Sequence, residues 1–345
     1  MFQNKYRIII AEVNKTDWAK DLDEFKHSLL ITPEWVGSMS NENTIPLYLN
    51  FIHEEKIIGK ISGFICDCGK LNGKQLYFYA SPALKEYDQD MFDAYHAALF
   101  NYAKNKGYSR IILGSYDQQH QLKTNASNFF TTTRFEYIID LTEPVKFDRC
   151  FRRNLKKAEN NNVEFKQNNS QEILNRLFEL LNITKEHRVS KYGSDYNPLF
   201  LRNMSYESLS RLIGNGIANL YYADCGEEIN IVCYNIEKNN RVYSLLLGSN
   251  DKSYELRLPS YLTYNMIMHS QNRGFVYYNP GGGTGDAGND GLERFKQSMG
   301  AKKTYFYGAT TNFIKFPQKL LNPLMNMGRM MPRKNPIVKL IKKII

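Results

Sequence analysis

From Phe295 to the C-terminus the sequence contains no Asp or Glu, although these 51 residues hold 11 Lys and Arg. The whole chain of 345 residues has 45 basic and 35 acidic side chains, so residues 1–294 hold 34 basic and 35 acidic ones. The body of the chain is therefore neutral, and the net charge of +10 belongs to one end. This distribution disfavours a protein coated in nucleic acid and favours an anionic partner near the C-terminus.

Long apolar runs are also absent. No stretch approaches the roughly 18 uninterrupted apolar residues of a membrane-spanning helix, and the apolar-rich run at 45–52 contains Pro46 and Asn50. The N-terminal residues lack the apolar region and cleavage site of a signal peptide. We therefore expect a cytoplasmic protein.

Cysteine is scarce, and the sequence motifs of several enzyme classes are missing. The five cysteines are odd in number and scattered, which is unlike a disulfide framework. Cys66 and Cys68 form a CxC pair with no second pair and no nearby His, so we predict no metal site. No HExxH, nucleophile-elbow serine or P-loop lysine is present, which gives no support to a metalloprotease, a triad hydrolase or a P-loop enzyme.

A glycine-rich segment follows the last predicted strand of the chain's body. Gly283, Gly285 and Gly288 formally match the dinucleotide-binding fingerprint, but the acidic residue expected about 20 positions later is absent because Glu293 is the last acid. We interpret the segment as a loop that is either flexible or closes over a substrate.

The chain contains the same order of elements twice: a hairpin, a third strand, a helix and a fourth strand. The first copy has strands at 47–52, 57–65 and 75–80, a helix ending at Gly107 and a strand at 110–113; the second has strands at 218–223, 229–236 and 241–247, a helix ending at Gly274 and a strand at 275–278. A glycine after a helix favours a left-handed C-terminal cap. The repeat predicts an α/β (α+β) fold made of two tandem units.

Further helices are predicted between and after the two copies. They cover residues 147–162 (opened by Asp148), 171–189, 198–212 and 291–299, and a strand is expected at 303–307. Four prolines in the tail exclude one continuous helix there. We therefore expect a first domain at 1–146, a second at 147–313 with a helical insertion at 147–213, and a basic tail at 314–345.

One of these helices gathers cations. At about 100° per residue, Arg149, Arg152, Arg153 and Lys156 share one face. The simplest interpretation is a solvated charged face. The sharper one is a platform for phosphates, because the guanidinium fork matches phosphate geometry.

The segment NDGLERFKQSMGA at 289–301, with RRNLKKAE at 152–159, TPEW at 32–35 and the repeated unit, resembles the FemAB-like aminoacyltransferases. The resemblance extends to about residue 312. It implies two tandem GNAT (acetyltransferase-type) domains, with helices inserted in the second. Members of this family add amino acids from aminoacyl-tRNA to cell-wall precursors, and relatives acylate other amines from acyl-CoA.

The resemblance implies an aminolysis reaction, in which an amine attacks an activated carbonyl and an oxyanion develops. Lys296, in the triplet that matches the family's RFK pattern, would supply positive charge near the oxyanion or the donor's phosphate; otherwise it is an ordinary surface lysine. Asp286 would accept the ammonium proton. We expect these two residues to be catalytic and the following ones to bind substrate: Arg149, Arg152, Arg153, Lys156, Arg294, Phe295, Tyr254, Gly282 and Gly283.

The sequence departs from the pattern of the enzymes that use CoA. Those GNAT proteins carry a glycine-rich loop before the central helix, where backbone N–H groups hold the pyrophosphate. Residues 248–259 here lack those glycines and include Pro259, which removes a donor. We therefore predict an enzyme that uses aminoacyl-tRNA as its donor and requires no cofactor or metal. One alternative is an enzyme that uses an acyl-CoA donor and an amino-sugar or polysaccharide acceptor. The other is a non-catalytic binding module.

The last ten residues, 336–345, form a cationic amphipathic pattern. On a helical wheel the six aliphatic side chains occupy an arc of roughly 160° with the lysines opposite. This pattern is typical of a helix on an anionic membrane surface, or of a helix docked on its own domain. We expect a peripheral location on the inner face of the membrane, and a lipid-linked or nucleotide-linked cell-envelope precursor as the acceptor.

Overall fold

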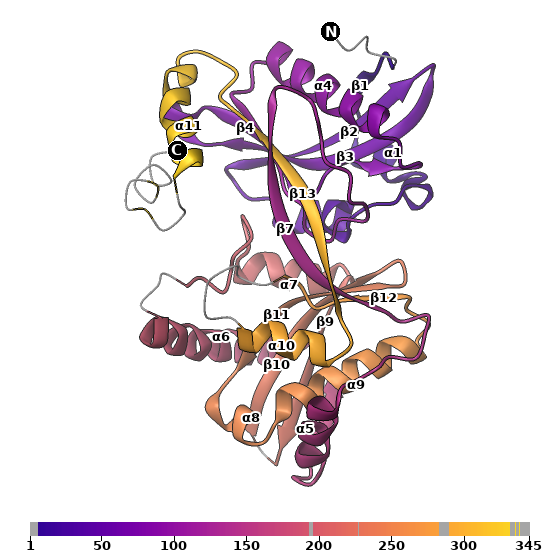
Figure 1. The fold of residues 1–345 in the computed structure, drawn as a ribbon, viewed down its shortest axis with the longest axis vertical. Coiled ribbons are helices and arrows are strands. Elements are labelled where there is room, and N and C mark those ends of the chain that lie inside the picture. Colours follow the sequence, from indigo (N-terminus) through magenta and orange to yellow (C-terminus); the bar gives the residue numbers. More distant parts are fainter. Residues whose placement is uncertain are drawn as a thin grey trace. The chain divides into compact units, whose positions relative to one another are not determined.

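The computed structural model describes residues 6–192, 196–226, 228–282, 290–331, 335 and 338. The chain forms two compact units, one of residues 1–134 with 306–345 and one of residues 135–305. These bounds differ from the predicted division at 146/147 and 313/314, because the chain crosses between the units inside strands β7 (Phe129–Asp140) and β13 (Lys302–Thr311) (Figure 1). The predicted domain boundaries stay a prediction.

The first unit is a sheet with strand order β1-β2-β3-β4-β6-β13, in which only β4 and β6 run parallel. Its strands are β1 (Ile9–Glu12), β2 (Thr44–His53), β3 (Lys56–Asp67), β4 (Lys74–Phe78), β5 (Ala83–Leu84) and β6 (Arg110–Leu113). Its helices are α1 (Lys15–Ala19), α2 (Pro33–Met39), α3 (Gly69–Asn72), α4 (Gln89–Asn105) and α11 (Asn322–Met330), with 3-10 turns η1 (Leu22–Glu24), η2 (Leu29–Ile31) and η3 (Gln318–Leu321). Apolar side chains of α4 and the strands form its core.

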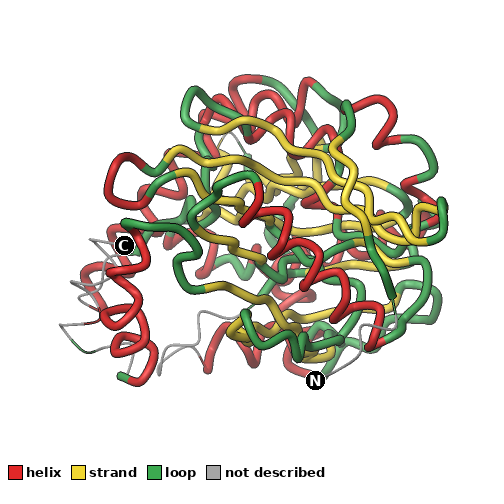
Figure 2. The backbone as a smooth tube through the Cα atoms, turned by 90° about the horizontal axis from the view of Figure 1, so that it is seen from above, coloured by secondary structure: helices red, strands yellow, loops and turns green. Residues whose placement is uncertain are grey.

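The second unit is a sheet with strand order β7-β12-β11-β10-β9-β8, in which only β11 and β12 run parallel. Its remaining strands are β8 (Glu164–Gln167), β9 (Ala218–Cys225), β10 (Glu228–Lys238), β11 (Arg241–Ser249) and β12 (Tyr277–Asn279). Its helices are α5 (Arg149–Glu159), α6 (Gln171–Tyr192), α7 (Tyr206–Gly214), α8 (Asp251–Glu255), α9 (Leu258–Asn272) and α10 (Asp290–Ser298). Figure 2 shows the long twisted strands together with the helices that flank them.

The predicted repeat is confirmed. In each unit a hairpin and a third strand precede a helix that returns the chain to a parallel fourth strand: β2-β3-β4-α4-β6 and β9-β10-β11-α9-β12. Both helices end at a glycine with positive φ, Gly107 at 75° and Gly274 at 78°. The strand that follows each copy is exchanged between the two units. Strand β7 follows the first copy in sequence but pairs with β12 of the second, and β13 follows the second copy but pairs with β6 of the first.

The structure corrects one predicted element and adds one that was not predicted. The helix expected at 198–212 begins only at Tyr206, because the Ser205 side chain caps it by accepting from the Ser208 N–H. The long strand β7 was not predicted at all. Asp148 does open α5, accepting a 2.7 Å hydrogen bond from the Phe151 N–H, as expected. Across the described ranges, no helix has both the length and the apolar character that a bilayer crossing requires.

Helix α6 packs on β11 at Gly248. A Cβ at this glycine would lie 2.8 Å from the Leu180 Cβ and 3.0 Å from the Leu177 carbonyl oxygen. We expect Gly248→Ala to lower the free energy of unfolding by about 1–3 kcal/mol, because α6 must shift. Urea unfolding measures this. Gly214→Ala at the end of α7 is the matched control, since nothing lies within 4 Å of a Cβ there; equal effects at both positions would contradict the predicted contact.

Candidate active site

The three side chains of the RFK triplet on α10 lie in three different environments. Arg294 is exposed to solvent. Phe295 packs against helix α5, with its ring centroid 6.0 Å from that of Phe151. Lys296 is turned inward and is only 7% exposed. The interpretation of Lys296 as an ordinary surface lysine is therefore wrong, because the side chain is buried in the second unit.

The Lys296 ammonium binds the backbone that leads into the glycine-rich loop. Its Nζ donates to the carbonyl oxygens of Pro280 at 2.6 Å, Gly281 at 3.1 Å and Gly282 at 2.8 Å. An ammonium has three N–H donors, so Lys296 can donate to all three carbonyls at once. The side chain thus fixes the direction in which the chain leaves β12, and the predicted residue Gly282 is part of this contact.

A series of hydrogen bonds between buried polar groups also supports this turn. Gly281 has φ of +74°, and its N–H donates to the Asn279 Oδ1 at 2.8 Å. The Asn279 Nδ2 donates to Glu136 of β7 at 2.8 Å, and the Tyr243 hydroxyl donates to the same carboxylate at 3.2 Å. Glu136 and Asn279 are fully buried. Because buried polar groups need partners, this series of hydrogen bonds holds the strand end and the loop start in one arrangement.

A second carboxylate lies on α10 itself. Glu293 accepts from the Tyr137 hydroxyl at 2.9 Å and contacts the Lys303 Nζ at 3.0 Å. The hydrogen bond from Lys303 lowers the pKa of Glu293. Burial, aided by Glu293, raises the pKa of Tyr137 to about 12. At neutral pH Tyr137 is therefore a donor that ties α10 to β7.

The sequence did not reveal Glu136, Asn279, Tyr243 or Glu293 as parts of this site. Glu136 lies on the strand that the periodicity analysis omitted. The available signal was the run of aromatic and β-branched residues at 129–140, in which Glu136 is an acid between two aromatic residues. Asn279 directly follows two tyrosines at the end of a predicted strand, a position where polar side chains often serve a site.

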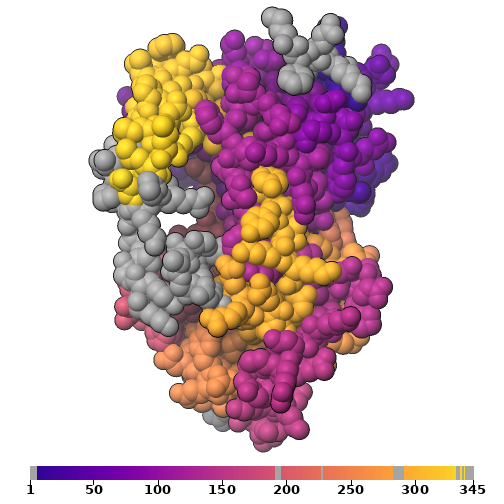
Figure 3. Space-filling model, in the orientation of Figure 1, coloured from indigo at the N-terminus to yellow at the C-terminus, as the bar shows by residue number. Residues whose placement is uncertain are grey.

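Helix α5 presents the predicted cationic face. All five of its basic side chains are exposed, whereas Phe151 and Ala158 are buried. None of the five forms an ion pair with a carboxylate in the part of the chain that the structure describes. Figure 3 shows α5 uncovered on one face of the second unit. Because α5 packs on α10 through Phe151 and Phe295, the cationic face and the Lys296 helix form one structural block.

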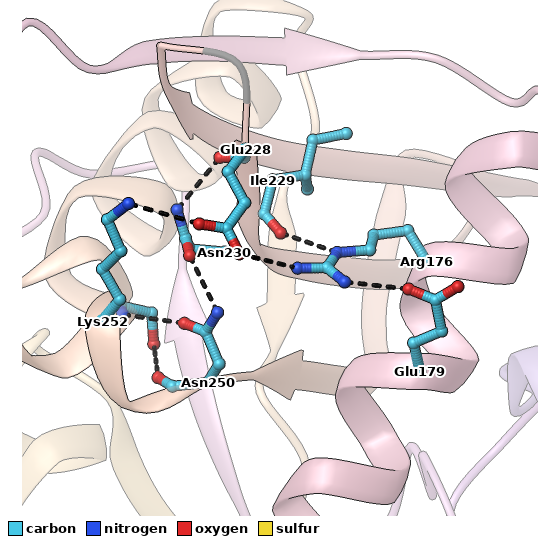
Figure 4. A network of polar contacts seen from close by, with 8 residues as sticks. Arg176, Glu179, Glu228, Ile229, Asn230, Asn250 and Lys252 are labelled. Atoms are coloured by element: carbon cyan, nitrogen blue, oxygen red, sulfur yellow. Dashed lines mark hydrogen bonds and ion pairs between the residues drawn. The ribbon is translucent and has the colours of Figure 1, made fainter.

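The segment before α9 carries the short helix α8 where enzymes that use CoA have a glycine-rich loop. A polar network surrounds the start of α8 (Figure 4), made by Arg176, Glu179, Glu228, Ile229, Asn230, Asn250 and Lys252. Asn250 caps α8 and also donates to Asn230 at 2.8 Å. Helix α9 then begins with Pro259 in its first turn. The backbone N–H groups of Asn250, Ser253 and Ser260 are therefore used within the protein, and Pro259 has none.

The remaining predicted residues are placed as follows. Tyr254 lies on α8, half exposed, and accepts a 3.2 Å hydrogen bond from the Ser249 hydroxyl; no contact in the described ranges brings it to Lys296. Asp286 and Gly283 lie outside the described residues. The thiol of Cys233 is fully buried, and burial raises its pKa to about 12, so it is no nucleophile. Among the described side chains, no three His, Cys, Asp or Glu residues gather as they would around a metal ion.

Comparison with known families decides the domain type. The model of the acetyltransferase (GNAT) domain matches residues 146–297. The second unit thus contains a GNAT acyltransferase domain. This stretch contains α5, the β9–β12 strands and the RFK triplet. No curated protein matches the chain by sequence.

Solved structures show the same fold over most of the chain. FemX superposes with a TM-score of 0.66 at 12% identity, covering 90% of this chain and 98% of FemX. L-PGS from Bacillus licheniformis gives 0.56 at 16% identity, with 90% and 96% covered. A tandem GNAT protein from the clavulanic acid biosynthesis pathway gives 0.53 at 9% identity, with 90% and 99% covered. The predicted tandem GNAT fold is confirmed, and the domain at residues 146–297 is of the acyltransferase (GNAT) type.

Proposed function

We propose that this GNAT protein transfers an aminoacyl group from aminoacyl-tRNA to an amine of a cell-wall precursor. The observation that carries the proposal is the buried Lys296, whose ammonium binds the three carbonyls that open the glycine-rich loop. This contact places a fixed positive charge beside the end of β12, next to the loop that would cover a substrate. A preorganised charge in a water-poor site stabilises a developing oxyanion far better than one in bulk water.

The proposed reaction is an aminolysis. The acceptor amine attacks the ester carbonyl carbon, the bond from that carbon to the tRNA ribose oxygen breaks, and an amide forms. The amine loses a proton, for which Asp286 is the proposed acceptor, and the ribose hydroxyl regains one. Lys296 supplies positive charge at the oxyanion or at the terminal ribose and phosphate. Glu136 and Asn279 position the loop from which these groups act.

The α5 cations are the proposed contact for the tRNA phosphates. The five exposed basic side chains of α5 have no carboxylate partner within the described ranges, and gathering them on one short helix is costly without an anionic partner, since like charges repel. The α8 network disfavours a pyrophosphate at the usual CoA position. The tail at 336–345 is proposed to hold the enzyme at the inner face of the membrane, where a lipid-linked acceptor is found.

The function is tested by incubating the protein with charged tRNA carrying labelled amino acids and with extracted lipid-linked precursors. Label on the precursor is the expected result. A protein that binds charged tRNA but labels no precursor would contradict the acceptor, and one that does neither would contradict the proposal.

An acyl-CoA donor is the second candidate. The family model that matches residues 146–297 describes an acetyltransferase domain, which favours it. Calorimetry with acetyl-CoA separates the two donors: binding in the micromolar range, with no transfer from charged tRNA, would establish CoA as the donor.

Removing α5 cations gives a test of the tRNA surface. We expect Arg149→Ala, Arg152→Ala and Lys156→Ala together to weaken tRNA binding and to lower the magnitude of the slope of log affinity against log salt by about two to three. The reason is that binding releases fewer counterions when fewer phosphates are contacted. Filter binding at several salt concentrations measures this slope. Lys252→Ala is the matched control, because Lys252 already pairs with Glu228 at 3.2 Å. If Lys252→Ala lowers the slope of log affinity against log salt as much as the triple variant does, α5 is not the specific tRNA site.

A further inference from the structure

Residues 315–330 of the first unit expose an unusual share of apolar surface. Across the described ranges, four of the fourteen large hydrophobic side chains that are exposed lie within these 16 residues. They are Phe316 at 66%, Leu320 at 71%, Met327 at 39% and Met330 at 87% exposed. Single exposed apolar residues are ordinary, but a concentration in one segment marks an interaction surface.

The segment is held in place from its other side. Gln318 is buried and its Nε2 donates to the Lys70 carbonyl at 3.2 Å. The Asn322 side chain accepts from the Phe313 N–H at 2.8 Å and donates to the Phe313 carbonyl at 3.0 Å, and Met325 is buried. The exposed apolar side chains are therefore presented outward by η3, α11 and the residues just before η3, all of which are anchored to the unit. Figure 3 shows this yellow segment uncovered on the face drawn.

The charge of the segment is of one sign. Lys315, Lys319 and Arg329 are exposed, and the chain has no acid after Glu293. Lys319 lies 5.9 Å from the Phe316 ring centroid, and the Arg329 guanidinium lies 3.8 Å above the half-exposed ring of Phe130. None of these three cations has a carboxylate partner in the described part of the chain. Exposed cations and exposed apolar side chains thus alternate along residues 315–330. Arg329 donates to the side chains of Asn312 and Asn326, so Lys315 and Lys319 are the cations that carry the argument.

We infer that residues 315–330 form a docking surface for an anionic lipid bilayer. Lipid phosphates match the cations, and the interfacial acyl region takes up Phe316, Leu320 and Met330. A nucleic acid would satisfy the cations but would leave the aliphatic side chains in water, so the observations favour the bilayer. The surface is independent of the catalytic proposal and of the tail at 336–345, since it rests only on the described residues 315–330.

The inference is tested with full-length protein and two kinds of vesicle, one of phosphatidylcholine and one with an equal share of phosphatidylglycerol. Phe316→Ser with Leu320→Ser is expected to reduce sedimentation with the anionic vesicles about tenfold, because two inserted side chains are lost. Ile45→Ser with Leu71→Ser is the matched control, since both side chains are more than half exposed on the same unit outside the segment. Equal binding of the two double variants would overturn the inference.

A fluorescence reporter locates the contact directly. The chain has two tryptophans, Trp18 and Trp35, and both are fully buried. Phe316→Trp therefore adds an exposed reporter, whose emission should shift to the blue with anionic vesicles and be quenched by brominated lipid. Ile45→Trp should show neither effect. If the protein binds the vesicles but the Phe316→Trp emission does not shift, the contact lies elsewhere and the inference is wrong. A blue shift on adding RNA without vesicles would also overturn the inference.

Discussion

Replacing Lys296 by methionine is expected to lower the rate of acyl transfer at least about 100-fold, because the change removes a preorganised charge from the site. It also leaves the carbonyls of Pro280, Gly281 and Gly282 without the donor that they share in the native protein. The Gly281 carbonyl keeps the Tyr137 N–H as a donor at 3.1 Å, so the loss falls on the partly buried carbonyls of Pro280 and Gly282. At about 1–3 kcal/mol for each unsatisfied acceptor, we expect a loss of about 3 kcal/mol in the free energy of unfolding. Transfer kinetics and urea unfolding measure the two effects separately.

Two variants show what Lys296 does. Lys296→Arg keeps the charge, but its planar fork cannot converge on three carbonyls as an ammonium does, so we expect stability and rate both to fall. Lys302→Met removes an exposed lysine of the same unit and should change neither quantity. If Lys296→Met is less stable but transfers at the native rate, Lys296 only holds the loop. If it is neither slower nor less stable, the carbonyl contact has no role.

The two tandem units were predictable because their signals are local. A hairpin, a helix and a terminating glycine each lie within a few residues, and Gly107 and Gly274 adopt the left-handed conformation that the sequence indicates. Helix α5 follows the same logic, since Asp148 caps it and the cations are spaced at helical intervals. Short-range periodicity decides such elements regardless of what they pack against.

The exchange of β7 and β13 was not predictable in this way. Whether β7 pairs with β12 or with β6 depends on contacts between residues more than 100 positions apart, such as Ile139 with Tyr278. Periodicity describes a strand's two faces but not its neighbour. The contact between Glu136 and Asn279 in the candidate site could not be predicted for the same reason, because only the pairing of β7 with β12 brings the two residues together.

The burial of Lys296 was equally hidden. On a helical wheel it lies between apolar Leu292 and acidic Glu293, which does not decide burial, and charged side chains are rarely buried unless they are paired. Its partners are backbone carbonyls, which every sequence contains and no motif identifies. Resemblance to the FemAB-like pattern indicated the residue, and the structure shows the physical reason for its position.

Acidification is expected to destabilise the first unit through a buried pair of histidines. His96 of α4 lies between Phe92 and Phe129, with ring centroids 4.5 and 5.0 Å away, and its Nε2 has no hydrogen-bond partner. His120 packs against the same Phe92 ring at 4.9 Å. Burial lowers the pKa of His96 to about 4. Burial, together with the charge of His96, lowers the pKa of His120 to about 3.

The direction of the effect follows from proton binding. Below pH about 6.5 the unfolded chain binds a proton at each imidazole while the folded chain does not, so the free energy of unfolding decreases as the pH falls. The decrease is complete only below the folded-state pKa values. At pH 5 the two groups together should cost about 4 kcal/mol, at about 1.4 kcal/mol per group and pH unit. Urea unfolding at pH 7 and pH 5 measures the difference.

Two readouts separate this pair from the carboxylates that also titrate. His96→Leu with His120→Leu should remove about 4 kcal/mol of the loss between pH 7 and pH 5, whereas His187→Leu, at a half-exposed site, should leave most of it. In proton NMR, the ring resonances of His96 and His120, identified by their absence from the double variant, should stay unshifted from pH 8 to pH 5. If these two sets of resonances titrate near pH 6.5, both imidazoles gain protons in the folded chain and burial among the aromatic rings does not exclude them.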